Sequence, residues 1–421
     1  MRIIRLDGSP EAVGSLTGAV AEALDGGPAV LPLGAAATAP APARAGTPGG
    51  PAIAPGPVRT PGTAGHPTRD APADDPGGVL VATSGSTGRP RVVVHRPAAL
   101  RASAAATAAR LGGPGRWLLA LPADHVAGVQ VVVRALLAGA PPVVQDLRGG
   151  FRPAGFAAAT ARLGTGRRYT SLVPTQLLRL LDAGGAALDA LLGYDAVLVG
   201  GAALDAGLRA RADAAGVRVV ATYGMTETAG GCVYDGVPLD GVRVRLDGAR
   251  DVPRDGAGDG AGRIAVAGPT LAAGYLDDPV ATAAGFVGTD GGREFRTGDL
   301  GRWVDGRLEV LGRVDDVVVT GGEKVAPAAV ERVLVAQPGV RAACVVGLPD
   351  PEWGAVVAAA LVVEGAPALD DLRAAVRAAL GRAAVPRVMR IVDALPLRGI
   401  GKPDRAAVVH LLRAPPVHAV D

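Results

Sequence analysis

The sequence predicts an α/β protein with a large N-terminal domain of parallel-rich sheets covered by helices, a small barrel-like subdomain, and a small α+β C-terminal domain. Its 421 residues exceed the size of one typical domain, and 49% hydrophobic against 20% charged residues allow a sizeable core. Between residues 78 and 311, short β-rich runs alternate with alanine-rich helical stretches, a pattern typical of parallel sheets covered by helices. After residue 312 the order of elements becomes that of a small α+β unit.

The first 34 residues predict one helix followed by one strand. An apolar pattern with helical spacing ends at Gly26 and Gly27, and a strand is expected at 29–33. Residues 35–77 then hold ten of the 35 prolines and seven glycines. Because such a composition can bury little apolar surface, we expect a flexible Pro/Gly/Ala-rich linker there.

The large domain is expected to span residues 78–311. Its predicted strands lie at 79–82, 117–121, 142–146, 169–173, 196–199 and 217–222. Its predicted helices lie at 98–111, 128–138, 153–163, 174–183 and 205–215. From residue 242 the pattern changes to short strands separated by turns, which indicates the antiparallel or barrel-like subdomain. These strands are expected at 242–246, 263–267, 301–304 and 308–311.

The C-terminal domain is expected to span residues 312–413 and to be followed by a loose tail at 414–421. Helices are predicted at 326–336 and 369–380, and strands at 341–348, 355–363 and 387–392. Two helices against a three-stranded sheet would make a small α+β domain of ordinary size.

Composition and charge exclude several kinds of protein. Aromatic residues make up 3% of the chain and its net charge is +3 without a basic block, which argues against a nucleic-acid-binding surface. Cys232 and Cys344 lie far apart in the sequence and outside any Cys/His cluster, so we expect two small core residues instead of a disulfide scaffold or a structural zinc site. Neither a signal-peptide pattern nor a membrane-spanning apolar run is found, and a soluble cytoplasmic protein is expected.

The sharpest motif is Thr83-Ser-Gly-Ser-Thr-Gly-Arg-Pro-Arg91, which directly follows a predicted strand. Glycines let a backbone approach phosphate oxygens, while N–H, hydroxyl and guanidinium groups donate hydrogen bonds or neutralise charge. The motif lacks the Gly-Lys-Ser/Thr ending of a P-loop, which excludes a P-loop kinase. From the residues alone it is either a polyphosphate cradle or a Ser/Gly-rich surface loop.

Two further motifs, Tyr223-Gly-Met-Thr-Glu-Thr228 and Arg296-Thr-Gly-Asp-Leu300, are weaker signals. In a turn at the carboxyl end of a strand, Glu227 could hold Mg²⁺, Thr226 could bond a phosphate, and Tyr223 offers a flat face for a base. Asp299 could accept ribose hydroxyls. For each motif the alternative is an ordinary turn.

The junction of the two predicted domains and the C-terminal region hold two more candidates. Polar, glycine-flanked segments at 312–316 and 321–325 suit a hinge, or else form a solvated loop. Lys402 lies between turn residues and could meet developing negative charge in a site, although a surface lysine is the simpler interpretation. A lone histidine such as His125 is more often satisfied by a backbone carbonyl than functional.

The motifs occur in one order, and over residues 78–411 they resemble those of the adenylate-forming superfamily of acyl- and aryl-CoA ligases, adenylation domains and luciferases. The segments Ser171-Leu-Val-Pro-Thr-Gln176 and Val197-Leu-Val-Gly-Gly-Ala202 are similar to the o-succinylbenzoate–CoA ligases of menaquinone biosynthesis. This resemblance implies two steps, in which the o-succinylbenzoate carboxylate attacks the α-phosphorus of Mg-ATP and CoA then displaces AMP. Gly268-Pro-Thr-Leu-Ala-Ala-Gly-Tyr275 also looks like a family motif.

The resemblance implies a large set of ATP-binding residues. They are Thr83, Ser84, Gly85, Ser86, Thr87, Gly88, Arg91, Gly201, Ala202, Tyr223, Gly224, Met225, Asp299 and Arg313. The serine, threonine and glycine residues at 84–88 would embrace the β- and γ-phosphates, whereas the residues at 201, 202 and 223 would enclose adenine. Arg91 departs from the family, which usually has lysine there, so the charge is kept but the geometry of the donor changes.

The resemblance also implies the catalytic and substrate-binding residues. Glu227 would hold Mg²⁺ and Thr226 would contact the α-phosphate, while Lys402 would stabilise charge during adenylation. Asp315 would be the hinge of a mobile C-terminal domain. The acyl pocket would be lined by His125 and Gly200, and the CoA tunnel by Gly321 and Gly322.

Three alternatives stay open from the sequence. A CoA ligase for another aromatic or fatty acid shares every nucleotide motif, and a stand-alone adenylation enzyme would load a carrier protein. A catalytically inactive nucleotide sensor is disfavoured because Glu227, Asp299, Arg313 and Lys402 occur together. The expected partners are the acid, ATP, Mg²⁺ and CoA, without nucleic acid or membrane, and a homo-oligomer is compatible with the sequence.

Overall fold

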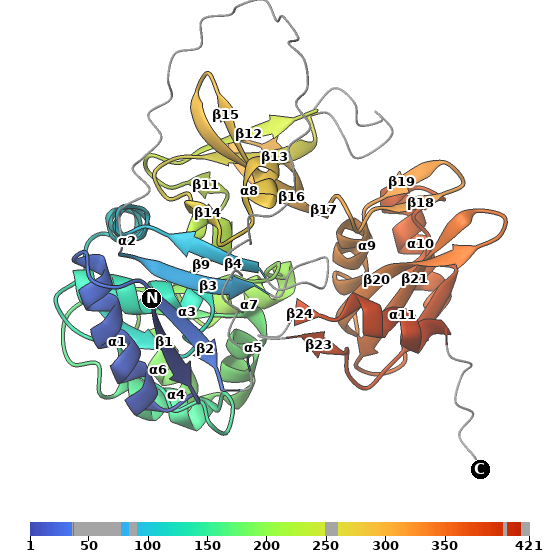
Figure 1. Cartoon of the computed structure of the whole chain (residues 1–421). Coiled ribbons are helices and arrows are strands. Elements are labelled where there is room, and N and C mark those ends of the chain that lie inside the picture. The colour runs from blue at the N-terminus through green and yellow to red at the C-terminus, as the bar shows by residue number, and fades with distance from the viewer. Residues whose placement is uncertain (36, 38–76, 84–90, 249–259, 399–401, 414–421) are drawn as a thin grey trace, which may run out of the picture.

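The computed structural model describes residues 1–35, 37, 77–83, 91–248, 260–398 and 402–413. It contains a large unit of two helix-covered sheets, an antiparallel sheet beside it, and a C-terminal unit (Figure 1). The α/β class that the sequence predicts is therefore confirmed. Of the predicted linker at 35–77, only residues 35, 37 and 77 are described, and the predicted tail at 414–421 lies outside the described residues.

The second sheet of the large unit is mainly parallel, as predicted, whereas the first combines parallel with antiparallel pairs. In the first, neighbouring strands are β1 (Arg2–Leu6), β2 (Val30–Gly34), β3 (Val79–Thr83), β4 (Arg91–His95) and β14 (Gly274–Tyr275). Its parallel pairs are β1–β2 and β2–β3, and its antiparallel pairs are β3–β4 and β4–β14. In the second, the order is β11 (Val237–Pro238), β10 (Gly230–Tyr234), β9 (Val219–Met225), β8 (Ala196–Val199), β7 (Arg168–Leu172), β5 (Arg116–Leu119) and β6 (Val143–Val144). Because β5 to β9 pair in parallel, their carboxyl ends meet at one edge of the sheet.

Helices cover both faces of the second sheet. They are α1 (Pro10–Leu24), α2 (Pro97–Arg110), α3 (Val126–Leu137), α4 (Pro153–Thr160), α5 (Pro174–Ala183), α6 (Gly185–Leu192) and α7 (Ala206–Ala214). Alternate residues of β5 meet the two layers, because Trp117 and Leu119 pack with α1 to α3 whereas Leu118 packs with α4 to α7. This is the period of two expected for a strand that is buried on both faces.

The antiparallel, barrel-like subdomain is also confirmed. Its strands are β12 (Arg243–Asp247), β13 (Gly262–Ala267), β16 (Gly292–Val304), β15 (Phe286–Thr289) and β17 (Arg307–Arg313), and α8 (Pro279–Gly285) precedes β15. The prediction of a short strand at 301–304 after a turn is wrong, since β16 has 13 residues and contains Asp299. A β-bulge between Leu300 and Gly301 lets the ladder with β17 continue past the Gly-Asp pair that resembles a turn.

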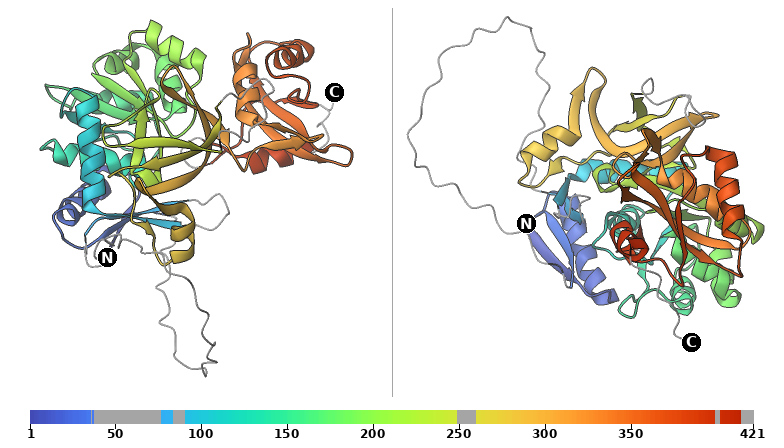
Figure 2. Two further views of the ribbon diagram at one scale, coloured as in Figure 1. Left: turned by 90° about the horizontal axis from the view of Figure 1, so that it is seen from above. Right: turned by 90° about the vertical axis from the view of Figure 1, so that its right-hand side faces the viewer.

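The C-terminal unit has more elements than the two helices and three strands predicted. Its sheet runs β19 (Glu323–Val325), β18 (Val318–Thr320), β21 (Gly354–Val363) and β20 (Val340–Asp350), with β22 (Val388–Ile391) beside β21. Its helices are α9 (Pro327–Val335), α10 (Leu369–Leu380) and α11 (Arg405–Arg413). Helices α9 and α10 cover one face and α11 the other, because α11 buries Val408 and Leu412 against Cys344 and its neighbours. Figure 2 shows this unit beside the large one from two further directions.

Strands β1 and β4 and helix α6 are absent from the sequence prediction. In β1, Arg2 and Arg5 interrupt the apolar run, although the strand pairs with β2 along its length. Helix α6 directly follows α5, and the chain turns between them at Gly184 and Gly185, which both have positive φ. Cys232 and Cys344 are buried free thiols, as expected. None of the helices described is long and apolar enough to span a membrane.

Candidate active site

The predicted phosphate loop connects β3 to β4. Its first and last residues, Thr83 and Arg91, pair in the β3–β4 ladder, and the Thr83 hydroxyl donates to the Arg91 carbonyl over 3.2 Å. The loop's central residues, Ser84, Gly85, Ser86, Thr87 and Gly88, lie outside the described residues. The two ends are therefore held together by the first sheet, whose edge also carries β14.

The motif at 223–228 begins inside a strand, which corrects the predicted turn. Tyr223, Gly224 and Met225 are the last residues of β9, and a short 3-10 turn, η1 (Thr226–Thr228), follows. The Thr228 hydroxyl organises this turn, since it accepts from the Met225 N–H at 3.0 Å and lies 2.8 Å from the Gly230 carbonyl. The strand continues through the motif because Tyr223 pairs with Val233 of β10. Thr226 and Glu227 are thus fixed at the carboxyl edge of the second sheet.

The glycines of the predicted adenine and acyl sites are required by packing. A Cβ atom on Gly200 would lie 2.2 Å from the Thr222 hydroxyl oxygen, and one on Gly224 would lie 2.0 Å from the Gly230 carbonyl oxygen. Gly201 has a φ of +82°, which only glycine adopts readily. Gly200, Gly201 and Ala202 directly follow β8, so they lie at the same sheet edge as the motif on β9.

Tyr223, Asp299 and Arg313 connect three strands. The Tyr223 hydroxyl donates to Asp299 Oδ2 over 2.9 Å, and Arg313 Nη1 lies 3.5 Å from Asp299 Oδ1. Asp299 and Arg313 are cross-strand partners in the β16–β17 ladder. Burial, reinforced by the negative charge of Asp299, raises the pKa of Tyr223. The phenol therefore stays protonated and remains a donor to the carboxylate that the sequence assigns to ribose.

An Asp299→Asn substitution should weaken ATP binding more than catalysis. It keeps the size of the side chain but removes the charge that lies between Tyr223 and Arg313, and a hydrogen bond to a charged group contributes about 1.5–3 kcal/mol. We expect the KM for ATP to rise by about tenfold or more, with a smaller change in kcat. Steady-state ATP titration measures this, with Tyr223→Phe as the control that preserves the carboxylate. An unchanged KM in Asp299→Asn would contradict the ribose assignment.

A second cluster brings Glu227, Tyr275 and Arg91 together. The Tyr275 hydroxyl donates to Glu227 Oε1 over 2.8 Å, and the Arg91 guanidinium lies 5.2 Å from the centre of the Tyr275 ring. Pairing of Tyr275 with Val93 in the β14–β4 ladder places β14 beside the loop end. Burial and the Glu227 charge raise the pKa of Tyr275, so it donates throughout the physiological range. Arg91 also lies 3.7 Å from Asp278.

Tyr275 is a site residue whose contact the sequence analysis missed. The Gly268–Tyr275 segment resembles a family motif, but sequence gives no sign that its tyrosine contacts a residue 48 positions away.

The sequence analysis missed His95 as well. It is fully buried on β4 and faces the backbone of Thr226, and burial lowers the pKa of its imidazole to about 4. His95 is therefore neutral at working pH, between the phosphate-loop strand and the Thr226 turn.

Glu227 is a suitable single protein ligand for Mg²⁺. Within the described residues, no group of three or more His, Cys, Asp or Glu side chains is placed to hold a metal ion. Magnesium is commonly bound by one or two carboxylates together with substrate phosphates and water. The Glu227 carboxylate fits this mode. Tyr275 orients it from β14, and the two ends of the phosphate loop lie on β3 and β4 of the same sheet as β14.

His125 and Gly200 also lie at the carboxyl edge of the second sheet. His125 directly precedes α3, and its Nδ1 lies 2.9 Å from Asp124 Oδ1, so its partner is a carboxylate instead of the expected backbone carbonyl. Gly34, at the end of β2, approaches the same carboxylate, because a Cβ atom there would lie 2.7 Å from Asp124 Oδ2. His125 thus has a fixed, half-exposed ring at the start of a buried helix.

The predicted hinge residue Asp315 lies in the segment that connects the two units, whereas the predicted tunnel residues Gly321 and Gly322 lie within the C-terminal unit. Asp315 is exposed and 3.7 Å from Arg313, whereas the neighbouring Asp316 forms an ion pair with Arg405 over 3.1 Å. Gly321 and Gly322, which the sequence places in a hinge or solvated loop, form the tight turn between β18 and β19 with φ of +56° and +85°. A Cβ atom on Gly321 would lie 2.6 Å from the Trp353 ring, so glycine is required here by packing.

Lys402 lies in a small hairpin of the C-terminal unit. The hairpin consists of β23 (Leu397–Arg398) and β24 (Lys402–Pro403), and Lys402 pairs with Arg398. In Figure 1 the hairpin of β23 and β24 lies on the side of this unit that is turned toward the large unit. Arg405, three residues later, anchors the hairpin because it pairs with Glu331 of α9 at 2.8 Å and with Asp316. The Lys402 side chain itself is not among the parts of the chain described.

Three features together define an adenylate-forming enzyme. The nucleotide-type motifs lie at the carboxyl edge of a parallel sheet, the barrel-like subdomain supplies Asp299 and Arg313, and a separate unit carries the hairpin with Lys402. Residues 24–276 match the AMP-binding enzyme family, and residues 329–402 match the AMP-binding enzyme C-terminal domain. The chain belongs to the AMP-binding enzyme family. The resemblance drawn from the motifs is thereby confirmed.

Individual relatives narrow the comparison. A probable 2-succinylbenzoate–CoA ligase of Mycobacterium tuberculosis is 47% identical over 343 residues, which cover 80% of this chain and 85% of that protein. A 2-succinylbenzoate–CoA ligase of Listeria monocytogenes is 31% identical, with 77% and 68% covered. The solved o-succinylbenzoate CoA synthetase of Bacillus subtilis, in complex with the acyl-adenylate intermediate, has a TM-score of 0.65 at 28% identity and covers 78% and 68% of the two chains.

Proposed function

We propose that this protein is an ATP- and Mg²⁺-dependent ligase that joins o-succinylbenzoate to CoA and releases AMP and pyrophosphate. The observation that carries the proposal is the 47% identity to the probable 2-succinylbenzoate–CoA ligase of Mycobacterium tuberculosis across 85% of its length. The clusters at Glu227 and Asp299 add a fitting chemistry, since they join the predicted phosphate, magnesium and ribose motifs at one sheet edge.

In the proposed first step, a carboxylate oxygen of the acid attacks the α-phosphorus, and the bond from that phosphorus to pyrophosphate breaks. Bound Mg²⁺ would neutralise phosphate charge, with Glu227 as its protein ligand. Asp299 and Arg313 would hold the ribose, while Tyr223 orients Asp299. Thr226 and Lys402 would contact the α-phosphate, and the serine, threonine and glycine residues at 84–88 of the phosphate loop would embrace the β- and γ-phosphates. The protein's contribution is positioning and charge stabilisation.

In the proposed second step, the CoA sulfur attacks the acyl carbonyl and AMP leaves with the electron pair of the C–O bond. Lys402 must leave the site first, so the C-terminal unit would rotate about Asp315 and bring the turn at Gly321 and Gly322 to the thiol path. His125 and Gly200 would line the acid pocket.

We also propose a cytoplasmic location, where ATP and CoA are supplied, and self-association, which gel filtration tests.

ATP–pyrophosphate exchange with o-succinylbenzoate, benzoate, salicylate and a medium-chain fatty acid tests the proposed substrate. We expect exchange with o-succinylbenzoate and a rate lower by at least 100-fold with the other three acids, because a site that hydrogen-bonds the polar groups of its substrate discriminates strongly against acids that lack them. Exchange with a different acid would keep the chemistry and overturn the substrate. Absence of exchange with all four acids would overturn the adenylation proposal for this set and favour the nucleotide-sensor alternative.

A further inference from the structure

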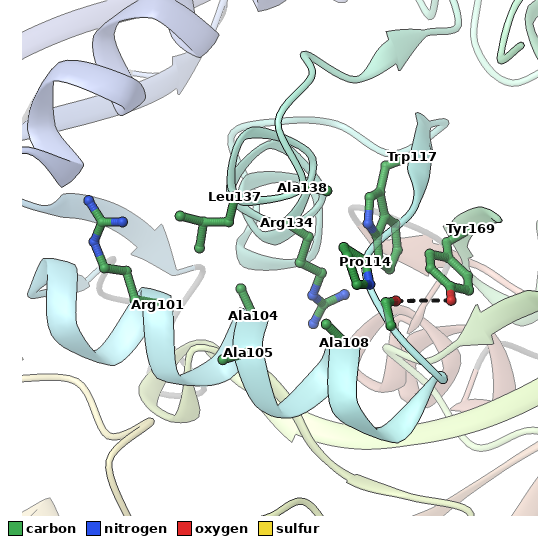
Figure 3. A pocket seen from close by; sticks show the side chains of 11 residues that line it. Arg101, Ala104, Ala105, Ala108, Pro114, Trp117, Arg134, Leu137, Ala138 and Tyr169 are labelled. Atoms are coloured by element: carbon green, nitrogen blue, oxygen red, sulfur yellow. Dashed lines mark hydrogen bonds between the residues drawn. The ribbon is translucent and has the colours of Figure 1, made fainter. Parts of the chain in front are cut away.

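A cavity of about 300 Å³ lies between α2, the last turns of α3 and the first residues of β5 and β7 (Figure 3). Trp117 and Tyr169, near the starts of their strands, form part of its wall. The candidate active site lies at the opposite, carboxyl edge of these parallel strands. Along α3, Arg134 in the cavity is about 12 Å from Val126, which follows His125. The cavity is therefore separate from the proposed acid and nucleotide sites.

Arg134 gives the cavity a buried positive charge. Arg134 is only 6% exposed, and within the described part of the chain its Nε has no hydrogen-bond partner. Nη2 donates to the Tyr234 hydroxyl at 3.3 Å, and the guanidinium lies 5.3 Å from the centre of the Trp117 ring. Among the residues described, no carboxylate forms an ion pair with Arg134. Because a buried cation without a counter-ion is costly, this arrangement calls for an anionic group.

The rest of the wall restricts the kind of anion. Ala104, Ala108 and Leu137 make it apolar, and Figure 3 shows the Arg134 side chain extending from α3 toward these alanines on α2. The Tyr169 hydroxyl donates to the Leu111 and Gly113 carbonyls, so its ring, not its polar end, is available.

The charge available in the cavity suits a monoanion. Arg101, the cavity's other cation, already pairs with Asp25 at 2.6 Å. One buried guanidinium with an unused N–H suits a carboxylate better than a dianionic phosphate, and the volume suits a small molecule. We propose that this cavity binds a small aryl or alkyl monocarboxylate, whose carboxylate pairs with Arg134 and whose apolar part lies against Trp117 and the alanines of α2.

Trp117 provides a direct reporter of binding. The chain has three tryptophans, so the Trp303→Phe/Trp353→Phe variant leaves Trp117 as the single tryptophan, whose fluorescence is excited selectively over that of tyrosine. We expect benzoate to change its fluorescence saturably, and the neutral isostere benzamide to have no such effect. Enzyme loaded with its acyl-adenylate, formed from ATP, Mg²⁺ and o-succinylbenzoate without CoA, should bind benzoate with the same affinity as free enzyme. The free-enzyme titration does not depend on the proposed function.

Variants of the reporter protein separate a binding site from a structural arginine. Arg134→Met should weaken benzoate binding by at least tenfold, whereas Arg101→Met should change it less than threefold. Ala108→Leu keeps Arg134 but fills the cavity, and should also abolish the fluorescence response, with thermal unfolding used to verify folding. The proposal would be overturned by absence of a saturable response, by a benzoate affinity in Arg134→Met or Ala108→Leu equal to that of the reporter protein, or by loss of binding in the adenylate-loaded enzyme.

Discussion

Replacement of Lys402 by alanine is expected to abolish adenylation while thioester formation from a supplied acyl-adenylate is largely spared. In the first half-reaction, the attacking carboxylate and the α-phosphate, both negatively charged, are brought together, and charge develops on the phosphate oxygens in the transition state. An ammonium group placed there lowers the barrier, and the loss of one such charge-stabilising group typically costs about 10²–10³-fold in rate. ATP–pyrophosphate exchange measures the first step, and CoA consumption with synthetic o-succinylbenzoyl-adenylate measures the second. Equal loss of both steps would contradict the assignment.

The chain provides its own matched control for this experiment. Only two of its 43 basic residues are lysines, Lys324 and Lys402, and the other 41 are arginines. Lys324 is exposed on β19, so Lys324→Ala should retain adenylation. A Lys402→Arg variant should keep the charge but not the compact, rotatable ammonium, and we expect it to recover little of the lost exchange. Full recovery would show that charge alone suffices at this position.

Local chemistry made several elements predictable from sequence. Helix α5 begins and ends where predicted, because Pro174 suits the first helical position and Gly184 ends the helix. Strand β8 is found with its predicted bounds, since a short apolar run of alanine, valine and leucine is buried on both faces of the parallel sheet. The long helix α10 also begins and ends at the predicted residues, where Gly381 follows with a φ of +83°.

Contacts between distant segments could not be predicted in the same way. The Tyr223–Asp299 and Tyr275–Glu227 hydrogen bonds join residues 76 and 48 positions apart, and they depend on how the half-barrel docks against the two sheets. The motifs indicated which residues take part, but only the β4–β14 pairing explains why Tyr275 lies beside Arg91. Gly200 and Gly224 show a second limit of sequence analysis. Their close contacts with Thr222 and Gly230 show that glycine is required there by packing, whereas the sequence suggested only a role in ligand binding.

Replacement of Glu227 by glutamine should have the second large effect, on the requirement for Mg²⁺. The substitution keeps an oxygen that can accept from Tyr275 but removes the negative charge proposed to hold the ion. We expect the adenylation rate to fall by about 100-fold at a fixed, low Mg²⁺ concentration, because a hard divalent cation prefers carboxylate oxygens. Titration of exchange activity with Mg²⁺ should show a higher half-saturating Mg²⁺ concentration, while adenylation still precedes thioester formation.

Tyr275→Phe is the matched control for that substitution. It preserves the Glu227 charge and removes the Tyr275 hydroxyl, which donates a 2.8 Å hydrogen bond to Glu227 Oε1 and so orients the carboxylate. One neutral donor contributes about 0.5–1.5 kcal/mol, so this variant should lose no more than about tenfold in rate and respond to Mg²⁺ nearly as the parent does. Thermal unfolding of both variants separates a metal effect from misfolding. An identical Mg²⁺ titration for Glu227→Gln and the parent enzyme would refute the role of Glu227 as a metal ligand. The hydrogen bond between Tyr275 and Glu227 would then have a structural role only.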